Sequence, residues 1–450
     1  MAATRTFRLA HALILLLVFM MPAMLLLAGA EERADHPTIL FWILLVLSAA
    51  GLTWLLTCCH PEESGNGQRA AALKVSRSSP EADAFADIVS PIVRVARSDV
   101  EDGVPVLDGA PLVPPAAVFP ELERRLAPYG MSPLVESLGG NAVRVVGLPA
   151  AADARLRSRA SAWVYLALFA ATIVTTVYAG ALQQGVNLLA DPSAFTIGLP
   201  YSVTLLAILG IHELGHYFTA KYYGVDVTPP VFIPVPMGLG TFGAFIQIKS
   251  LIRTRQAVFD IGIAGPLAGL VVALPLLYIG LQQSMPIAEP RAGVGVPSHA
   301  SLLFALVLAA AQGGGLGQSA VAPSPVAFAA WIGIVVTALN LVPIGQLDGG
   351  HVAYALFGRK HARTISVVTV LGMAIGGLLA WPGLLTWALL ITLIAGFSHM
   401  PALDDRTPPD FTRYALGALS LVILLLIVLP APGSARLHST SAQRVSITKP

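Results

Sequence analysis

The sequence predicts an α-helical polytopic membrane protein with about nine transmembrane helices, a re-entrant β-like loop and a small cytosolic α/β domain. Hydrophobic residues make up 55% of the 450 residues, and charged residues only 12%. The mean hydropathy is +0.74, and apolar runs long enough to cross a bilayer recur along the chain. These runs are Leu9–Ala30, Thr38–Thr57, Trp163–Leu182, Tyr201–Tyr223, Ala257–Ile279, Pro325–Leu341, Ile365–Ala380, Leu384–Phe397 and Tyr414–Leu429.

Two transmembrane helices are expected within residues 1–58. The first run has a basic start, and Ala28-Gly29-Ala30 resembles a cleavage site, so a signal peptide is the alternative. We favour a retained helix because the run is long for a signal. Cys58 and Cys59 are the two cysteines of the chain, and neighbouring cysteines rarely pair, so no disulfide framework is expected.

The composition of residues 59–80 is that of a linker, and residues 81–150 are predicted to form the small cytosolic domain. Within it, Glu121–Leu126 reads as helix and Asn141–Val146 as an alternating strand after a Gly-Gly turn. A domain of this size builds only a modest core. We therefore expect it to rely on the membrane portion or on a partner.

Charge and turn residues set the expected topology. Most of the 27 Lys and Arg residues fall in cytoplasmic loops if the N-terminus is cytoplasmic. The net charge of +2 gives no reason to expect nucleic-acid binding. Leu302–Ala311 is too short to cross and is interpreted as an interfacial helix. Asp404 and Asp405 are interpreted as a solvated cytoplasmic loop.

The loop Asp226–Gln256 combines four prolines, a glycine-rich run and the strand-like segment Ala244–Lys249. This pattern predicts an extended segment or hairpin rather than a helix. The loop is also unusually apolar. Because non-helical backbone at membrane depth must lie against protein or a water-filled cavity, we expect a re-entrant loop.

His212-Glu213-Leu214-Gly215-His216 is an HExxH motif inside the fourth apolar run. Residues four apart share a helix face, so the two imidazoles can supply two nitrogen ligands to a zinc ion. Glu213 can act as general base toward a water molecule. A polar pair at a helix interface and the ion site of a transporter are the alternative interpretations.

The third ligand is sought in Asn340–His351, where Pro343 and several glycines break the sixth run. This break turns Asp348 toward the bundle interior. Asp348 is therefore the predicted third ligand. His351 is either a supporting partner of Asp348 or a polar residue at a helix end. Gly265 and Gly269 form a small-xxx-small pair that indicates helix packing.

HELGH followed by Asn340-Leu341-Val342-Pro343 and Leu347-Asp348-Gly349 resembles the site-2 protease family of intramembrane zinc metalloproteases. The resemblance covers a protease domain at residues 161–430. Residues 431–450 are predicted to form a tail. It implies that His212, His216 and Asp348 bind one Zn²⁺ and that Glu213 is the catalytic base. It also implies that Asn340 positions substrate or stabilises the oxyanion.

The resemblance further implies regulated intramembrane proteolysis, with transmembrane proteins as substrates. We recognise no PDZ domain in the sequence, which favours the cyanobacterial and plastid-type branch. A metal-ion transporter and a catalytically inactive membrane scaffold are the alternatives. A bacterial inner membrane is favoured over a plastid membrane because the N-terminal sequence lacks a long Ser-rich transit segment. The sequence does not predict an oligomeric state or name a substrate.

Overall fold

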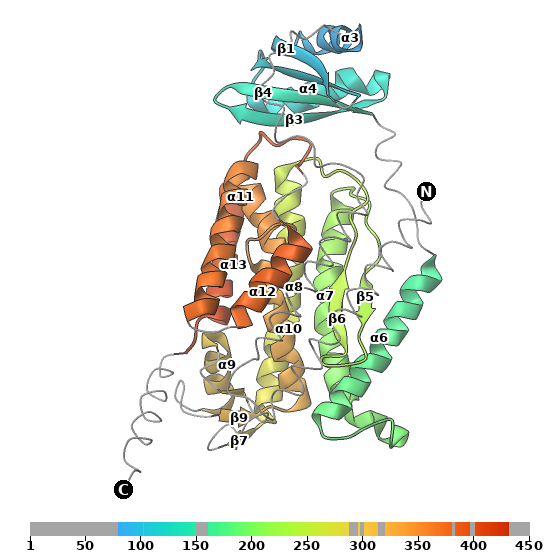
Figure 1. Cartoon of the computed structure of the whole chain (residues 1–450), viewed down its shortest axis with the longest axis vertical. Helices are drawn as coiled ribbons and strands as arrows, with labels where there is room; N and C mark the ends of the chain where they lie inside the picture. Colours follow the sequence, from blue (N-terminus) through green and yellow to red (C-terminus); the bar gives the residue numbers. More distant parts are fainter. Residues whose placement is uncertain are drawn as a thin grey trace. The chain divides into compact units, whose positions relative to one another are not determined.

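The computed structural model describes most of the chain from residue 80 to residue 431 (Figure 1). The described ranges are 80–101, 103–149, 161–287, 296–297, 301–313, 320–379, 383–396 and 401–431. The two N-terminal apolar runs, Cys58, Cys59, the linker and the C-terminal tail therefore lie outside the described residues.

The described part of the chain is mostly helical, as predicted, with small antiparallel sheets. Four of its helices are long and apolar enough to cross a membrane: α6 Ala162–Gln183, α8 Arg255–Gln282, α11 Asp348–Leu379 and α13 Phe411–Val428. The other large helices are α7 Leu199–Tyr222, α9 Leu302–Gln312, α10 Pro325–Leu341 and α12 Gly383–Ala395. Short 3₁₀ turns occur at Ala127–Tyr129 and Pro192–Ile197.

Local sequence explains where the central helices begin and end. Thr254 caps α8 by accepting a hydrogen bond from Ala257 N–H, and Ser324 caps α10 from Ala327 N–H. Helix α10 ends at Leu341, two residues before Pro343, and α11 begins at Asp348. The break predicted between them is present. Helix α11 itself contains a non-helical residue, Gly358, with φ 78°, a backbone conformation that glycine adopts readily.

A β-hairpin follows α7 and lies beside it, and this part of the predicted loop is extended rather than helical. Strand β5 Val231–Pro234 pairs antiparallel with β6 Thr241–Phe245. The prediction of a strand at Ala244–Lys249 is therefore wrong in its bounds. The strand starts earlier, at Thr241, which pairs with Pro234 and whose hydroxyl donates to Ile233 O at 2.9 Å. Beyond β6, only an isolated bridge joins Ile248 to Val227.

The turn of this hairpin is fastened to two helices. Thr175 of α6 donates its hydroxyl to Gly240 O at 2.6 Å, and Tyr201 of α7 donates to Leu239 O at 3.0 Å. A side chain at Gly240 would collide with the backbone of α6. The hairpin therefore has a fixed height along α7. A separate three-stranded sheet, β7 Met285–Ile287, β9 Ala320–Ala322 and β8 Val296–Pro297, joins the loops around α9.

Residues 80–149 form a four-stranded antiparallel sheet with two helices, here called the sheet module. Its elements are α3 Pro80–Val89, β1 Val93–Glu101, β2 Val104–Pro111, α4 Pro115–Leu126, β3 Met131–Gly139 and β4 Ala142–Pro149, with strand order β1-β2-β4-β3. The module is an αββ unit used twice. Strands β3 and β4 begin 38 residues after β1 and β2, and Leu107 pairs with Val145, its counterpart in the repeat.

The core of the sheet module includes a residue from the far end of the chain. Leu403 is 7% exposed and packs in that core, and Leu251 packs against it. Val135 N–H of edge strand β3 donates to Leu403 O at 2.7 Å, and Asp405 N–H donates to Val135 O at 3.1 Å. The small core is thus completed by loops of the helical part, as the size of the module led us to expect.

The interpretation of Asp404 and Asp405 as a solvated loop is wrong. Asp404 is 9% exposed, and it accepts hydrogen bonds from the Thr407 hydroxyl and from Arg406 N–H. Asp405 accepts a hydrogen bond of 2.7 Å from the Tyr354 hydroxyl. Asp404 is buried and Asp405 half-buried, and both belong to the segment that pairs with β3. Hydrogen bonding satisfies both carboxylates there.

Replacing Leu403 with Ala is expected to destabilise the sheet module by about 2–5 kcal/mol, the usual cost of truncating a buried leucine. The measurement is hydrogen exchange at Val135 N–H, whose acceptor is Leu403 O. Leu112→Ala is the matched control because Leu112 is 52% exposed. Equal protection in the two variants would contradict a core role for Leu403.

Candidate metal centre

Helix α7 carries the HExxH motif on its buried side. His212 is 2% exposed, and Glu213 and His216 are each 6% exposed. The ring centroids of the two imidazoles are 4.9 Å apart, as four-residue spacing on a helix requires. The burial of three ionisable side chains in an apolar helix is costly unless they serve one another or a ligand.

Asp348, the first residue of α11, completes the cluster. Its Oδ2 lies 3.2 Å from His212 Nε2 and 3.3 Å from His216 Nε2, and the two Nε2 atoms are 3.2 Å apart. The break between helices α10 and α11 therefore brings Asp348 next to histidines that are more than 130 residues away in the sequence. Among the described residues, His212, His216 and Asp348 are the group of three suited to hold a metal ion.

The spacing of these three atoms fits zinc. Zinc binds imidazole nitrogen and carboxylate oxygen at about 2.0–2.2 Å, and tetrahedral ligands at those lengths lie about 3.3–3.6 Å from one another. The observed separations are 3.2, 3.2 and 3.3 Å. A tetrahedral ion bound by all three would keep its fourth position free, as catalytic zinc sites do.

The tautomer of His216 supports a cation at this point. His216 Nδ1 lies 2.7 Å from Ile261 O of α8, and because a carbonyl only accepts, Nδ1 carries the proton of that bond. In the neutral ring, Nε2 then presents a lone pair toward the Asp348 carboxylate. Two acceptors face each other at 3.3 Å, an arrangement that a metal ion satisfies. Such a carbonyl contact commonly orients metal-binding imidazoles.

Helix α8 approaches the two imidazoles closely at two glycines. A Cβ atom at Gly265 would lie 2.1 Å from His216 Nε2, and one at Gly269 would lie 3.3 Å from His212 Nδ1. The small-xxx-small pair does pack helices, as the sequence indicated. The sequence reasoning missed that the packed surface is the metal-ligating face of α7. Gly265 and Gly269 are four residues apart, as are His212 and His216. This equal spacing is the signal that could have revealed the contact between the glycines and the histidines.

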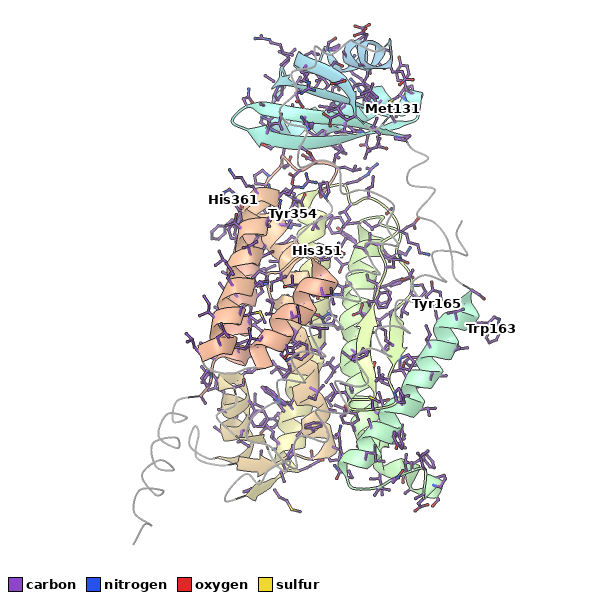
Figure 2. The ribbon with its side chains drawn as sticks, viewed as in Figure 1. Met131, Trp163, Tyr165, His351, Tyr354 and His361 are labelled. Carbon is purple, nitrogen blue, oxygen red and sulfur yellow. The ribbon has the colours of Figure 1, made fainter. Side chains whose placement is uncertain are left out.

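Three further residues lie around the cluster. Asn340, near the end of α10, places Nδ2 3.4 Å from His212 Nε2. The Glu213 carboxylate contacts the backbone N–H of Ile246, just after β6. His351 lies in the first turn of α11 (Figure 2), where its Cβ faces Gly262 of α8. The hairpin, α7, α8, α10 and α11 thus all contribute to one site.

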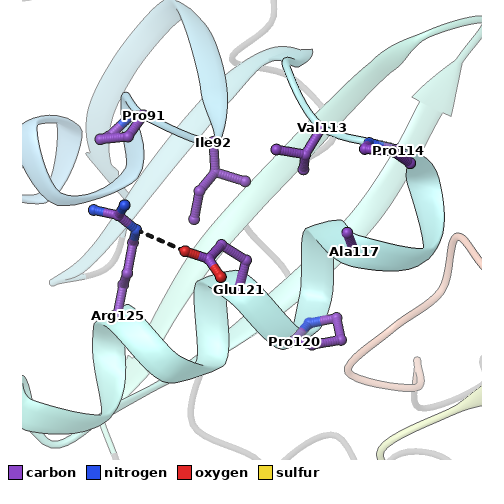
Figure 3. Close-up of a pocket in the computed structure, with 8 residues that line it drawn as sticks. All are labelled: Pro91, Ile92, Val113, Pro114, Ala117, Pro120, Glu121 and Arg125. Atoms are coloured by element: carbon purple, nitrogen blue, oxygen red, sulfur yellow. Dashed lines mark hydrogen bonds and ion pairs between the residues drawn. The ribbon is translucent and has the colours of Figure 1, made fainter.

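A separate hollow of 460 Å³ lies in the sheet module (Figure 3). Prolines and aliphatic residues line most of it, and the Glu121–Arg125 ion pair of 3.2 Å lies at its side. It contains none of the cluster residues. Its lining residues are Pro91, Ile92, Val113, Pro114, Ala117, Pro120, Glu121 and Arg125.

A helical membrane fold that gathers both histidines of an HExxH motif and a later aspartate at one buried point has the donor set of a membrane zinc metallopeptidase. Residues 200–380 match the family model described as Peptidase family M50. This part of the chain is thus similar to that family, the site-2 protease family. The resemblance seen in the motifs is confirmed.

Three of the similar proteins come from a plant, Arabidopsis thaliana. The chain is 36% identical over 242 residues to the probable zinc metalloprotease EGY1, chloroplastic, of Arabidopsis thaliana, covering 52% of this chain and 43% of that protein. It is 32% identical over 245 residues to EGY2 of the same plant, a protein of the same description, covering 52% and 42%. The probable zinc metallopeptidase EGY3, chloroplastic, is 32% identical over 293 residues, covering 60% and 50%. The chain spans about half the length of these relatives.

Gly265→Ala is expected to weaken zinc binding at least about 10-fold, the lower range for changes beside metal ligands, because the added methyl would collide with His216 Nε2. The measurement is zinc affinity of the purified protein by competition with a chelator. Gly372→Ala in α11 is the matched control, since a Cβ there meets nothing within 4 Å. Unchanged affinity in Gly265→Ala would contradict the tight contact.

Proposed function

We propose that the protein is an intramembrane zinc metalloprotease that hydrolyses peptide bonds in or near transmembrane segments of membrane-protein substrates. The observation that carries this proposal is the triangle of the buried His212 and His216 with the half-buried Asp348, with Glu213 in the helical position after His212. In this assignment His212, His216 and Asp348 hold one Zn²⁺, and Glu213 is the catalytic base.

The residues around the cluster supply the acid–base chemistry. Bound zinc would act as a Lewis acid toward the scissile carbonyl and lower the pKa of water. The Glu213 carboxylate takes a proton from the attacking water and delivers it to the leaving amine. Asn340, whose Nδ2 is 3.4 Å from His212 Nε2, is placed to donate to substrate or to the developing oxyanion.

The hairpin supports a mode of substrate binding. A peptide bond inside a helix is hidden by its own hydrogen bonds, so the substrate must become extended before attack. A substrate segment added to β6 would exchange its helical bonds for strand bonds. Ile246, just beyond β6, contacts Glu213, so a strand added there would run past the proposed base.

The arrangement in the membrane also remains a proposal. We propose about nine crossings, a cytoplasmic N-terminus, a re-entrant position for β5 and β6, and a protease domain at 161–430 behind the cytosolic domain 81–150. The names of the relatives describe chloroplastic proteins, which supports a plastid membrane. The sequence itself favoured a bacterial inner membrane. Proposed partners are a transmembrane protein substrate and the bilayer.

A metal-ion transporter is the second candidate, and the residues beyond His212 argue against it. Ser202 and Thr204 are polar side chains on that part of α7, and they are only 2% and 5% exposed. Ser202 Oγ is hydrogen-bonded to Thr176 Oγ1 at 2.6 Å. The Ser202 hydroxyl thus joins two helices, and these buried hydroxyls argue against an ion pathway through this part of α7. An inactive scaffold would have no need for the buried Glu213 carboxylate.

Glu213→Gln is expected to lower proteolysis about 10²–10⁴-fold, the range for loss of a general base, while zinc remains bound. The measurement compares fragments of membrane proteins in cells that carry the wild-type or the Glu213→Gln chain. Fragments present in the wild type alone identify substrates. Equal fragments from both would refute Glu213 as the base.

Asp348→Ala is expected to lose bound zinc because two imidazoles alone leave the site one protein ligand short. The zinc content of the purified variant should fall well below the one ion per chain expected for the wild type. Asp404→Ala is the control, because Asp404 is a buried aspartate outside the cluster. Equal zinc in wild type and Asp348→Ala would remove Asp348 from the ligand set.

A further inference from the structure

Helices α7 and α8 are in contact along one seam that includes the metal centre. Gly269 faces His212, Gly265 faces His216, and Ile261 O accepts the hydrogen bond from His216 Nδ1. Residue numbers along the seam decrease on α8 as they increase on α7, so the two helices are antiparallel. If α8 shifted along this seam, Ile261 O and the backbone at Gly265 would both move relative to His216, which they contact.

A polar cluster closes the seam directly beside Ile261. Asp260, the preceding residue, accepts a hydrogen bond from the hydroxyl of Tyr223, which follows the last residue of α7. Asp260 also accepts two bonds from Arg413 of α13, from Nε at 2.9 Å and from Nη2 at 2.6 Å. One carboxylate thus joins three helices.

The geometry of this contact is well suited to fix a helix position. A two-pronged arginine–carboxylate pair is directional as well as strong. The side chains of Arg413 and Asp260 are only 18% and 23% exposed, so solvent screens the pair less than a surface ion pair. A second acidic residue, Asp410, holds Arg413 Nη1 at 2.9 Å and orients the guanidinium toward α8.

We propose that Asp260, Arg413 and Tyr223 are positioning residues for the metal centre. They hold α8 at the height along α7 where Ile261 O meets His216 Nδ1 and where Gly265 leaves just enough space for the imidazole. Their effect on His216 passes through the backbone of α8, since none of them touches the three ligand atoms. The inference rests on the proposed zinc site and extends it to residues outside the family motifs.

The test measures zinc affinity and site geometry, not proteolysis. Full-length protein in detergent is stripped of metal and titrated with Zn²⁺ against a chelator, and with Co²⁺ to record its absorption spectrum. Arg413→Met and Asp260→Asn are expected to weaken zinc binding about 10-fold, the lower end for residues that orient metal ligands, and to alter the Co²⁺ spectrum. Arg413→Lys, which keeps the charge but not the two-pronged contact, should lie between them and the wild type.

Arg359→Met is the matched control. It also removes an arginine–carboxylate pair, of 3.0 Å to Glu136, but joins α11 to β3 and is not on the seam. Its zinc affinity should equal that of the wild type. The thermal unfolding of each metal-free variant is recorded so that affinity is compared between folded proteins. If Arg413→Met does not fold, Arg413→Lys and Tyr223→Phe carry the same comparison.

A seam variant with a lower unfolding temperature but wild-type zinc affinity and Co²⁺ spectrum would overturn the inference, because a purely structural pair gives that result. Failure of the proposed function is distinguishable. It would appear as a wild-type protein that does not bind zinc, whereas failure of the inference alone leaves tight binding in the wild type and in every variant.

Discussion

The close approach of α8 to the ligand-bearing face of α7 is the constraint on which the site depends. Two glycines of α8 stand opposite the two histidines, and a side chain at Gly265 would occupy the space of the His216 ring. The same helix also provides Ile261 O, which accepts a hydrogen bond from His216 Nδ1. One helix therefore fixes both the position of an imidazole and its tautomer, and the ring cannot rotate without losing that bond.

Sequence reasoning predicted three residues that the structure brings together, because each leaves a local signal. Four-residue spacing places His212 and His216 on one face, and the break at Pro343 shows that the chain turns before Asp348. Sequence reasoning failed where the environment of a residue depends on contacts with residues far away in the sequence. Leu403 looks like any loop leucine, yet it packs in a core formed by residues 85–145. Asp404 and Asp405 looked solvated because this segment pairs with β3 and Asp405 bonds to Tyr354, and the local pattern contains neither partner.

The sheet module shows how a small repeated unit can be made stable. Two αββ units pair through β2 and β4, which leaves β1 and β3 as the edges of the sheet. Edge strands carry unpaired backbone groups. The β3 edge is joined to residues 403–405, whose own N–H groups at Leu403 and Asp404 donate to Ile252 O and Arg253 O. The same three-residue segment thus links the module to the chain just before α8.

Charge balance explains why a retained metal suits this site better than a transported one. With neutral imidazoles, the Asp348 carboxylate contributes a negative charge beside two buried histidines, and a divalent cation offsets it. A transporter must release its ion at each cycle, which would leave this carboxylate uncompensated where desolvation is costly. A hydrolase keeps the ion, and the peptide group that it cleaves is neutral before the reaction. The buried position is therefore compatible with the proposed hydrolysis and unfavourable for repeated ion exchange.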